Sequence, residues 1–170
     1  MHAIVLLAAG LLQAGVPDLF SLQADLQGRY DEISQASLQF QTEADIDDFH
    51  DVMYTADWSV TDSAGHRHEW ADLRAQAIQA LTAPPPTAMV QSIRKVALGP
   101  AGAIVTVNLT TVRTVMDVEG RYGRKGATHS LNETIPYRDM WVMAPGGWKL
   151  KAREQIGPPK VLVDKPDYEP

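Results

Sequence analysis

The sequence predicts an α+β domain in which N-terminal helices pack in the concavity of a curved, mostly antiparallel sheet. Two observations support this fold class. Apolar residues recur at steps of three and four between residues 17 and 81, which is the period of an α-helix. After Pro84-Pro85-Pro86 the period changes to two, which is typical of β-strands. Helices followed by a run of hairpins indicate an α+β arrangement rather than alternating βαβ units.

The first predicted helix spans residues 17–41. Pro17 suits its first turn, and the carboxylate of Asp18 complements the positive end of the helix dipole. Thr42 can cap a second helix, and a third is predicted at residues 69–81. The apolar stripes of the three helices are Leu19, Leu22, Leu26, Tyr30, Ile33, Ser37 and Phe40, then Ile46, Phe49 and Met53, then Trp70, Leu73, Ala77 and Leu81.

Strands are predicted where apolar and polar residues alternate. A short strand at residues 57–62 precedes the third helix and ends in the turn Asp62-Ser63-Ala64-Gly65. Four longer strands follow the prolines, and glycine-containing turns separate the first pair and the last pair. These strands are predicted at residues 87–98, 103–118, 128–143 and 148–157.

The length of 170 residues fits one domain, and residues 17–157 carry all the predicted helices and strands. Residues 158–170 contain four prolines and are predicted to be irregular. Residues 1–16 include an apolar run, Ala3–Leu12, that suits a secretory signal peptide and is too short to span a bilayer. This pattern predicts a periplasmic or secreted protein without a membrane span. The alternative is a cytoplasmic protein with an N-terminal extension, because no Lys or Arg precedes the run.

Composition and motifs exclude several classes of function. The formal net charge is −6 and the basic residues are scattered, so nucleic acid is not a predicted partner, because phosphate binding needs Lys and Arg on one face. The chain has no cysteine, which excludes disulfides, thiolate metal sites and thiol nucleophiles. It also contains no phosphate-cradling loop, and no cofactor is predicted.

The last hairpin predicts which face of the sheet points inward. A four-residue turn at 144–147 fixes the register, and one face then carries cations from both strands: Arg138, Lys149, Lys151 and Arg153. Because these charges belong in water, the opposite face is predicted to be the inner one. Its opposed pairs are Met143–Trp148, Trp141–Leu150, Asp139–Ala152 and Tyr137–Glu154.

The same register extends to the two preceding strands. It places Val105 beside Trp141, Val107 beside Asp139, and Arg94 opposite Val107. Arg94 would then lie two strands from Asp139, about 10 Å, which a long side chain can largely close. An inward carboxylate needs such a partner or a wet cavity, because burying it unpaired is costly.

Three short motifs follow one another in the chain: Tyr54-Thr55-Ala56-Asp57-Trp58, then Asp62-Ser63-Ala64-Gly65, then Tyr137-Arg138-Asp139-Met140-Trp141-Val142 ending in Gly146-Gly147-Trp148-Lys149-Leu150. Their order and spacing resemble the nuclear transport factor 2-like superfamily, and most of all its SnoaL-like group of small bacterial proteins. The resemblance covers residues 20–157. It implies a cone-shaped α+β barrel, a pocket between the long helix and the concave sheet, and frequent homodimers. It implies no single function, because the superfamily includes isomerases, cyclases, dehydratases and transport adaptors.

The leading prediction is a small-molecule-binding domain of unassigned activity with a hydrophobic pocket between helix and sheet. A small hydrophobic molecule is the predicted partner, since aromatic side chains spaced along helix and sheet can line such a pocket. The candidate ligand-binding residues are Tyr30, Tyr54, Trp58, Arg94 and Trp141.

A first alternative is an isomerase, cyclase or dehydratase that acts on a small apolar carbonyl compound. Asp139 or Glu154 would be the base, and Tyr137 or Tyr54 would donate a hydrogen bond to an enolate. The competing interpretation makes both carboxylates structural ion-pair partners. No catalytic motif of the superfamily is matched, so these roles rest on the predicted inner face alone.

A second alternative is a homodimeric interaction module that uses the outer face of the sheet. The predicted cations of that face disfavour self-association unless acidic residues interleave with them. A metal site is not predicted either. His66 and His68 could join Glu69 or His129, but polar residues are ordinary in a turn that leads into a helix.

Overall fold

The computed structural model describes residues 18–164. Within this range the chain forms three helices and one seven-stranded sheet. Among the described helices, none is both long enough and apolar enough to cross a membrane. The signal peptide predicted at residues 1–16 lies outside the described residues.

The first two helices begin at side chains that accept hydrogen bonds from their first backbone N–H groups, whereas the third has no side-chain cap. Asp18 accepts a hydrogen bond from Phe20 N–H at the start of the first helix, which ends at residue 37 rather than near 41. The second helix starts at a capping box, in which Thr42 and Asp45 each accept a hydrogen bond from the other's backbone N–H. The helices are α1 (Leu19–Ser37), α2 (Glu43–Met53) and α3 (Trp70–Ala80).

The sheet has the order β2-β1-β6-β5-β4-β3, and β7 pairs with β5. β1 and β6 run parallel, and all other neighbouring strands run antiparallel. Residues 158–170 were expected to be irregular, yet four of them form β7, because the residues after the prolines have free N–H groups that can pair with β5. The strands are β1 (Tyr54–Thr61), β2 (Arg67–Glu69), β3 (Ala88–Gly99), β4 (Gly102–Met116), β5 (Thr128–Ala144), β6 (Gly147–Gln155) and β7 (Lys160–Val163).

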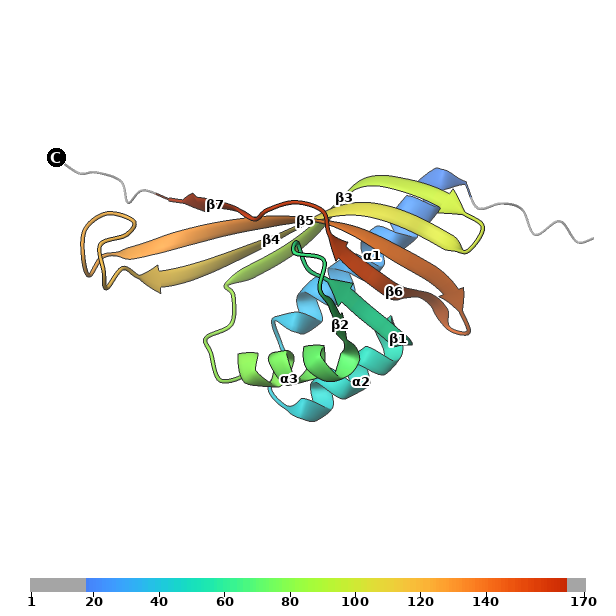
Figure 1. Ribbon diagram of the computed structural model, residues 1–170, viewed down its shortest axis with the longest axis horizontal. Helices are drawn as coiled ribbons and strands as arrows, with labels where there is room; N and C mark the ends of the chain where they lie inside the picture. The colour runs from blue at the N-terminus through green and yellow to red at the C-terminus, as the bar shows by residue number, and fades with distance from the viewer. Residues whose placement is uncertain (1–17, 165–170) are drawn as a thin grey trace, which may run out of the picture.

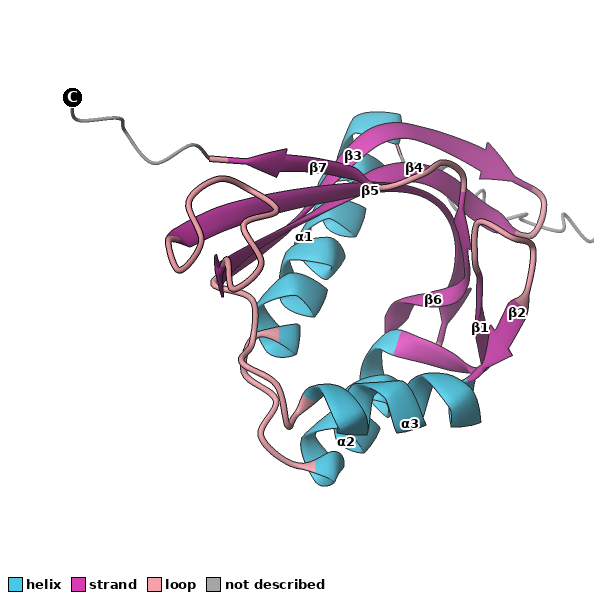
Figure 2. Cartoon of the chain, turned by 60° about the vertical axis from the view of Figure 1, so that its left-hand side comes forward, coloured by secondary structure: helices cyan, strands magenta, loops and turns pink. Residues whose placement is uncertain are grey.

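The sheet curves around the helices, which lie on its concave side (Figures 1 and 2). α1 packs against β3, while α2 packs against β1 and β6. The predicted inner face is confirmed at Trp141, Leu150 and Asp139, which are fully buried, whereas Met143, predicted on the same face, is 63% exposed. The core joins the stripe of α1 to this face and contains Leu22, Leu26, Tyr30, Ile33, Met53, Ala103, Val105, Val107, Trp141 and Leu150.

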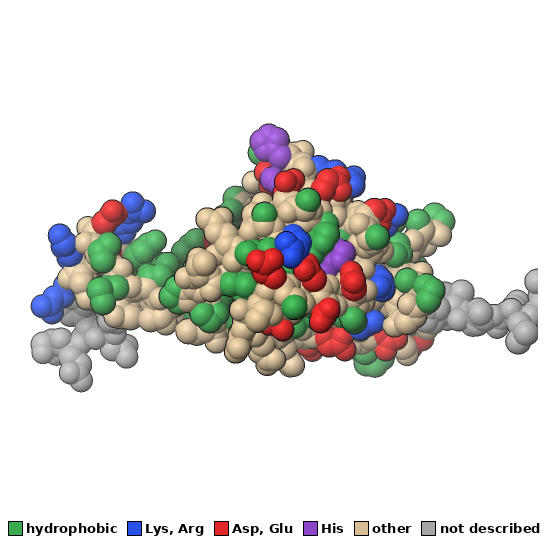
Figure 3. All heavy atoms as spheres, turned by 90° about the horizontal axis from the view of Figure 1, so that it is seen from below, with side chains coloured by type: hydrophobic (Ala, Val, Ile, Leu, Met, Phe, Trp, Pro, Cys, Tyr) green, Lys and Arg blue, Asp and Glu red, His purple; other side chains and the backbone are tan. Residues whose placement is uncertain are grey.

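The outer parts of β4 and β5 project beyond the helices, and with β7 and the connecting residues 117–127 they form what we call the arm (Figure 1). Asp117 orders its tip by accepting hydrogen bonds from the backbone N–H groups of Arg121 and Tyr122, both at 2.8 Å. Charge is divided between the arm and the body. Figure 3 shows acidic side chains gathered over the helical face and basic ones at the tip of the arm.

Candidate functional site

A buried ion pair lies at the centre of the concave face. Asp139 on β5 has no exposed surface, and Arg153 on β6 lies opposite it. Arg153 Nε donates to Asp139 Oδ1 at 2.9 Å, and Nη2 donates to Oδ2 at 2.6 Å. Two parallel hydrogen bonds between guanidinium and carboxylate offset the cost of removing both charges from water.

The ion pair is tied to α1 through an aromatic pair. The Tyr30 hydroxyl donates to Asp139 Oδ2 at 2.8 Å and accepts from Trp141 Nε1 at 2.8 Å. The two rings meet edge to face, with centroids 5.2 Å apart. Tyr30 and Trp141 therefore satisfy each other's polar atoms inside the core, which is the usual condition for burying such side chains.

A glutamine closes the other side of the ion pair. Arg153 Nη2 donates to Gln91 Oε1 at 2.7 Å, and Gln91 Nε2 donates to Ser34 Oγ at 3.3 Å. Gln91 is almost fully buried. We refer to the whole group as the buried polar network, which consists of Tyr30, Ser34, Gln91, Asp139, Trp141 and Arg153.

Burial keeps the tyrosines of this region neutral. It raises the pKa of Tyr30 far above the ordinary value, and the charge of Asp139 raises it further. Burial raises the pKa of Tyr54 to about 12, although the charge of Arg153 opposes the change. It also raises the pKa of Tyr137. All three hydroxyls therefore stay protonated at a pH at which an exposed tyrosine ionises.

The prediction that Glu154 points inward is wrong. A β-bulge shifts the register between Met140 and Trp141, so Arg138 rather than Tyr137 faces Glu154. Glu154 pairs with Arg138 at 2.8 Å on the solvent side, where about half of each side chain is exposed. The same shift turns Arg153, predicted to face outward, into the core.

Arg94 is not the partner of Asp139. It occupies a second register shift, between Ile93 and Lys95 on β3, and its side chain is exposed. With the Asn108 amide oxygen turned toward it, Arg94 Nε donates to that oxygen at 3.1 Å. Gln91 takes the position near the ion pair instead. Alternation along β3 could have identified Gln91, which follows Met89 by two residues on the same face.

The remaining predicted residues, Tyr54, Trp58 and Tyr137, are partly buried and pack against the core that contains Trp141. Tyr54 and Trp58 lie together on β1 with ring centroids 4.1 Å apart, and both are half-buried. Tyr137 lies under the Arg153 guanidinium at 4.8 Å from the ring centroid. Of the eight predicted site residues, Glu154 and Arg94 therefore lie away from the concave centre.

Two further rings, His50 and Trp70, which were not predicted as site residues, lie beside Tyr54 and Trp58. His50 on α2 stacks on Trp70 of α3 at 3.9 Å and also lies against Tyr54 at 5.7 Å. His50 Nε2 and Trp58 Nε1 are buried and have no hydrogen-bond partner in the part of the chain that the structure describes. The four-residue spacing from Ile46 to His50 places both on one face of a helix, and it could have predicted that His50 is buried.

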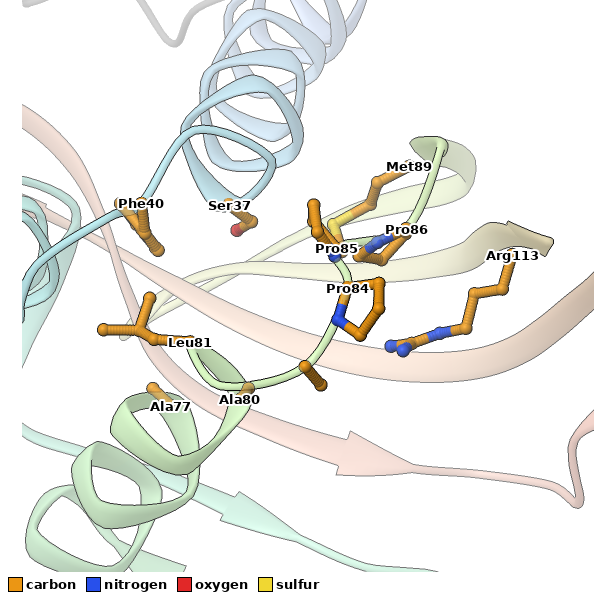
Figure 4. Close-up of a pocket in the computed structure, with 11 residues that line it drawn as sticks. Ser37, Phe40, Ala77, Ala80, Leu81, Pro84, Pro85, Pro86, Met89 and Arg113 are labelled. Atoms are coloured by element: carbon orange, nitrogen blue, oxygen red, sulfur yellow. The ribbon is translucent and has the colours of Figure 1, made fainter. Parts of the chain in front are cut away.

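An open pocket of about 300 Å³ lies where the ends of α1 and α3 approach the proline segment (Figure 4). Its walls are mainly apolar, and the Ser37 hydroxyl in them is already committed to the Ile33 carbonyl at 2.7 Å. The lining residues are Ser37, Phe40, Ala77, Ala80, Leu81, Ala83, Pro84, Pro85, Pro86, Met89 and Arg113. None of the predicted site residues belongs to this lining, which we call the proline pocket.

The histidines near the first turn are engaged with an aspartate. His66 Nδ1 and His68 Nε2 each lie 3.3 Å from Asp62 Oδ2, while Glu69 pairs with Arg67. Hydrogen bonds from the His66 backbone N–H, with those from Ala64 and both rings, lower the pKa of Asp62 to about 2. Within residues 18–164 no group of three or more His, Cys, Asp or Glu side chains is arranged to hold a metal ion.

Comparison with known proteins identifies the fold. No protein-family model and no curated protein matches the chain. A protein from Kribbella flavida matches with a TM-score of 0.54 at 16% identity over 83% of this chain and 92% of its own. A nuclear transport factor 2-like superfamily protein from Salmonella enterica matches with 0.54 at 12% identity over 84% and 95%. A type-3 hexachlorocyclohexane dehydrochlorinase from Novosphingobium barchaimii matches with 0.53 at 12% identity over 89% and 97%.

These likenesses establish that the chain has the nuclear transport factor 2-like fold, as the three motifs implied. The neighbours include an enzyme and proteins without a stated activity, so the shared fold is compatible with ligand binding and with catalysis. The choice between them depends on the chemistry of this chain's own residues.

Proposed function

We propose that the chain is a small-molecule-binding domain whose ligand is small, largely apolar and held in the proline pocket. The observation that carries the proposal is this open, mainly apolar space of about 300 Å³ beside the concave sheet. Pockets of this kind bind ligands through apolar walls and a few oriented polar groups, and this volume lies at the small end of the usual range.

The surroundings of the carboxylates favour binding over catalysis. Asp139 has no exposed surface, and both of its oxygens are occupied by Arg153 and Tyr30. A general base must reach the proton that it removes. Between residues 18 and 164, the residues that line the proline pocket include no Asp, Glu, His, Lys or Tyr that could act as an acid or base.

Thermal unfolding with the apolar probes octan-1-ol and indole tests the proposal. A bound probe raises Tm by about 3–6 °C at ten times its Kd, because it stabilises only the folded state. Ala77→Trp fills the pocket from α3 and should abolish the rise. Ala75→Trp places the same side chain on the exposed side of α3 and should retain it. No rise in the wild type, or an equal rise in both variants, would contradict the proposal.

An acid–base enzyme is the second candidate, and Tyr54 is the observation in its favour. The Tyr54 hydroxyl makes no hydrogen bond within residues 18–164, yet its pKa responds to the charges of Arg153 and Asp139. A free neutral donor beside an ion pair can stabilise an enolate. In this candidate Asp139 would be the base that removes the α-proton of a small ketone, and Tyr54 would donate to the enolate oxygen. The protein should then exchange α-hydrogens of small ketones with D₂O by NMR, and Tyr54→Phe should remove the exchange. A wild type that leaves ketones unexchanged excludes it for these substrates.

A further inference from the structure

Among the described residues that line the proline pocket, Arg113 is the one with a charged side chain. It extends from β4, and its guanidinium turns toward Pro84 at the edge of the pocket (Figure 4). Arg113 is exposed and makes no hydrogen bond or ion pair with any other residue between 18 and 164. Five donors are therefore free at the edge of an apolar space.

Most arginines of the body differ from Arg113 in having a carboxylate partner. The Arg29, Arg74, Arg138 and Arg153 side chains each pair with an Asp or Glu at 3.0 Å or less. In the described part of the chain Arg94 and Arg124 also lack such a partner, but neither belongs to the lining of the proline pocket. Arg113 thus combines an unused positive charge with access to a pocket.

The acidic side chain of Glu133, on the strand next to that of Arg113, affects the charge around the guanidinium. Glu133 on β5 is paired in register with Thr111, two residues before Arg113, so that Glu133 and Arg113 project from the same face of the sheet. No ion pair joins Glu133 to Arg113 among the arginine pairs of residues 18–164. Glu133 is also absent from the pocket lining, so an anion in the pocket would contact Arg113 but not Glu133.

We infer that the ligand of the proline pocket is a carboxylate amphiphile, with its apolar body among Phe40, Leu81 and the prolines and its carboxylate on Arg113. The inference rests on the proposed function and adds the head group of the ligand. The planar guanidinium fork fits a carboxylate through two parallel hydrogen bonds. One cation balances one negative charge, which suits a monoanion.

Three probes with one tail and different heads test the inference: octanoate, octan-1-ol and octylammonium. Isothermal titration calorimetry at low ionic strength, below the concentrations at which the probes aggregate, gives a Kd for each. Wild type should bind octanoate about three- to tenfold more tightly than octan-1-ol and octylammonium most weakly. The preference for octanoate should weaken as salt is added, because Arg113 is exposed to screening.

Matched variants assign the preference to one side chain. Arg113→Gln should bring the affinities for octanoate and octan-1-ol together while leaving octan-1-ol binding intact. Arg124→Gln removes a charge from the tip of the arm and should leave the preference unchanged. Glu133→Gln should strengthen octanoate binding, because it removes the nearby negative charge.

The outcomes separate the head group from the pocket. If wild type binds octanoate and octan-1-ol equally, or if the preference survives in Arg113→Gln, the carboxylate inference is wrong and the proposed function stands. If the wild type binds none of the probes, the proposed function fails and the inference fails with it. A preference that is lost only in Arg113→Gln supports both.

Discussion

Asp139 and Glu154 were predicted to share one face, but their surroundings are opposite. Asp139 is fully buried and faces a guanidinium that is 11% exposed, whereas Glu154 and Arg138 are each about half exposed. A buried charge pair depends on both partners, because losing one leaves the other charge unpaired in the core. An exposed pair contributes little, because water and salt screen it.

The same chemical change at these two positions should therefore give different results. Asp139→Asn keeps the shape of the side chain but leaves Arg153 without its counter-charge, and we expect the free energy of unfolding to fall by about 3–5 kcal/mol. Glu154→Gln should lower it by less than about 1 kcal/mol. Urea unfolding followed by tryptophan fluorescence measures both. Equal losses would mean that the ion pair of Asp139 is not the structural element described above.

Tyr54 gives a prediction for alkaline pH. Its folded-state pKa of about 12 exceeds the ordinary value of 10.0, so folding favours the neutral phenol. This contribution is complete below pH 10 and is lost as the pH rises from about 10 toward 12. We expect wild type to lose up to about 2 kcal/mol more stability over this interval than Tyr54→Phe. Urea unfolding of both proteins across the interval measures the difference, and parallel pH profiles would contradict it.

At the scale of elements, local patterns located the helices and strands well. The Pro84–Pro86 segment and the glycine turns end helices and strands through the backbone properties of proline and glycine themselves. The observed ends of β3 to β6 therefore lie within two residues of the predicted ends. The predicted inner face also holds where no bulge intervenes, as for Trp141 and Leu150. A sequence pattern of a few residues carries information only about residues that are close together in the chain.

The errors come from features that no local pattern contains. Between the Trp141–Leu150 and Met140–Ala152 pairs, β6 carries one extra residue, Lys151. Every residue of β6 after Lys151 therefore lies on the face opposite to the predicted one. Arg153 points into the core and Glu154 points to solvent. The proline pocket was not predicted either, because its walls come from helix ends, a proline segment and two strands that are distant in sequence.

At the scale of the whole molecule, the bulge also alters the outer face of the sheet. Four cations were predicted there, and their mutual repulsion argued against pairing of two copies. Arg153 is now inside, Arg138 pairs with Glu154, and Lys151 pairs with Asp57 at 3.1 Å. Acidic side chains thus interleave with these cations, so the charge repulsion that argued against self-association through this face is reduced.

We therefore expect a homodimer that packs outer face to outer face. Val90 and Ile104 project from this face and are 52% and 38% exposed, a surface that burial in an interface would stabilise. Light scattering during size-exclusion chromatography should give about twice the 18.7 kDa chain mass. Ile104→Glu should yield a monomer that remains folded, because the new charge would be desolvated only in the interface. Val52→Glu changes an exposed valine on α2 and should leave the dimer intact. A wild type that elutes as a monomer at all concentrations would show that this face is free in solution.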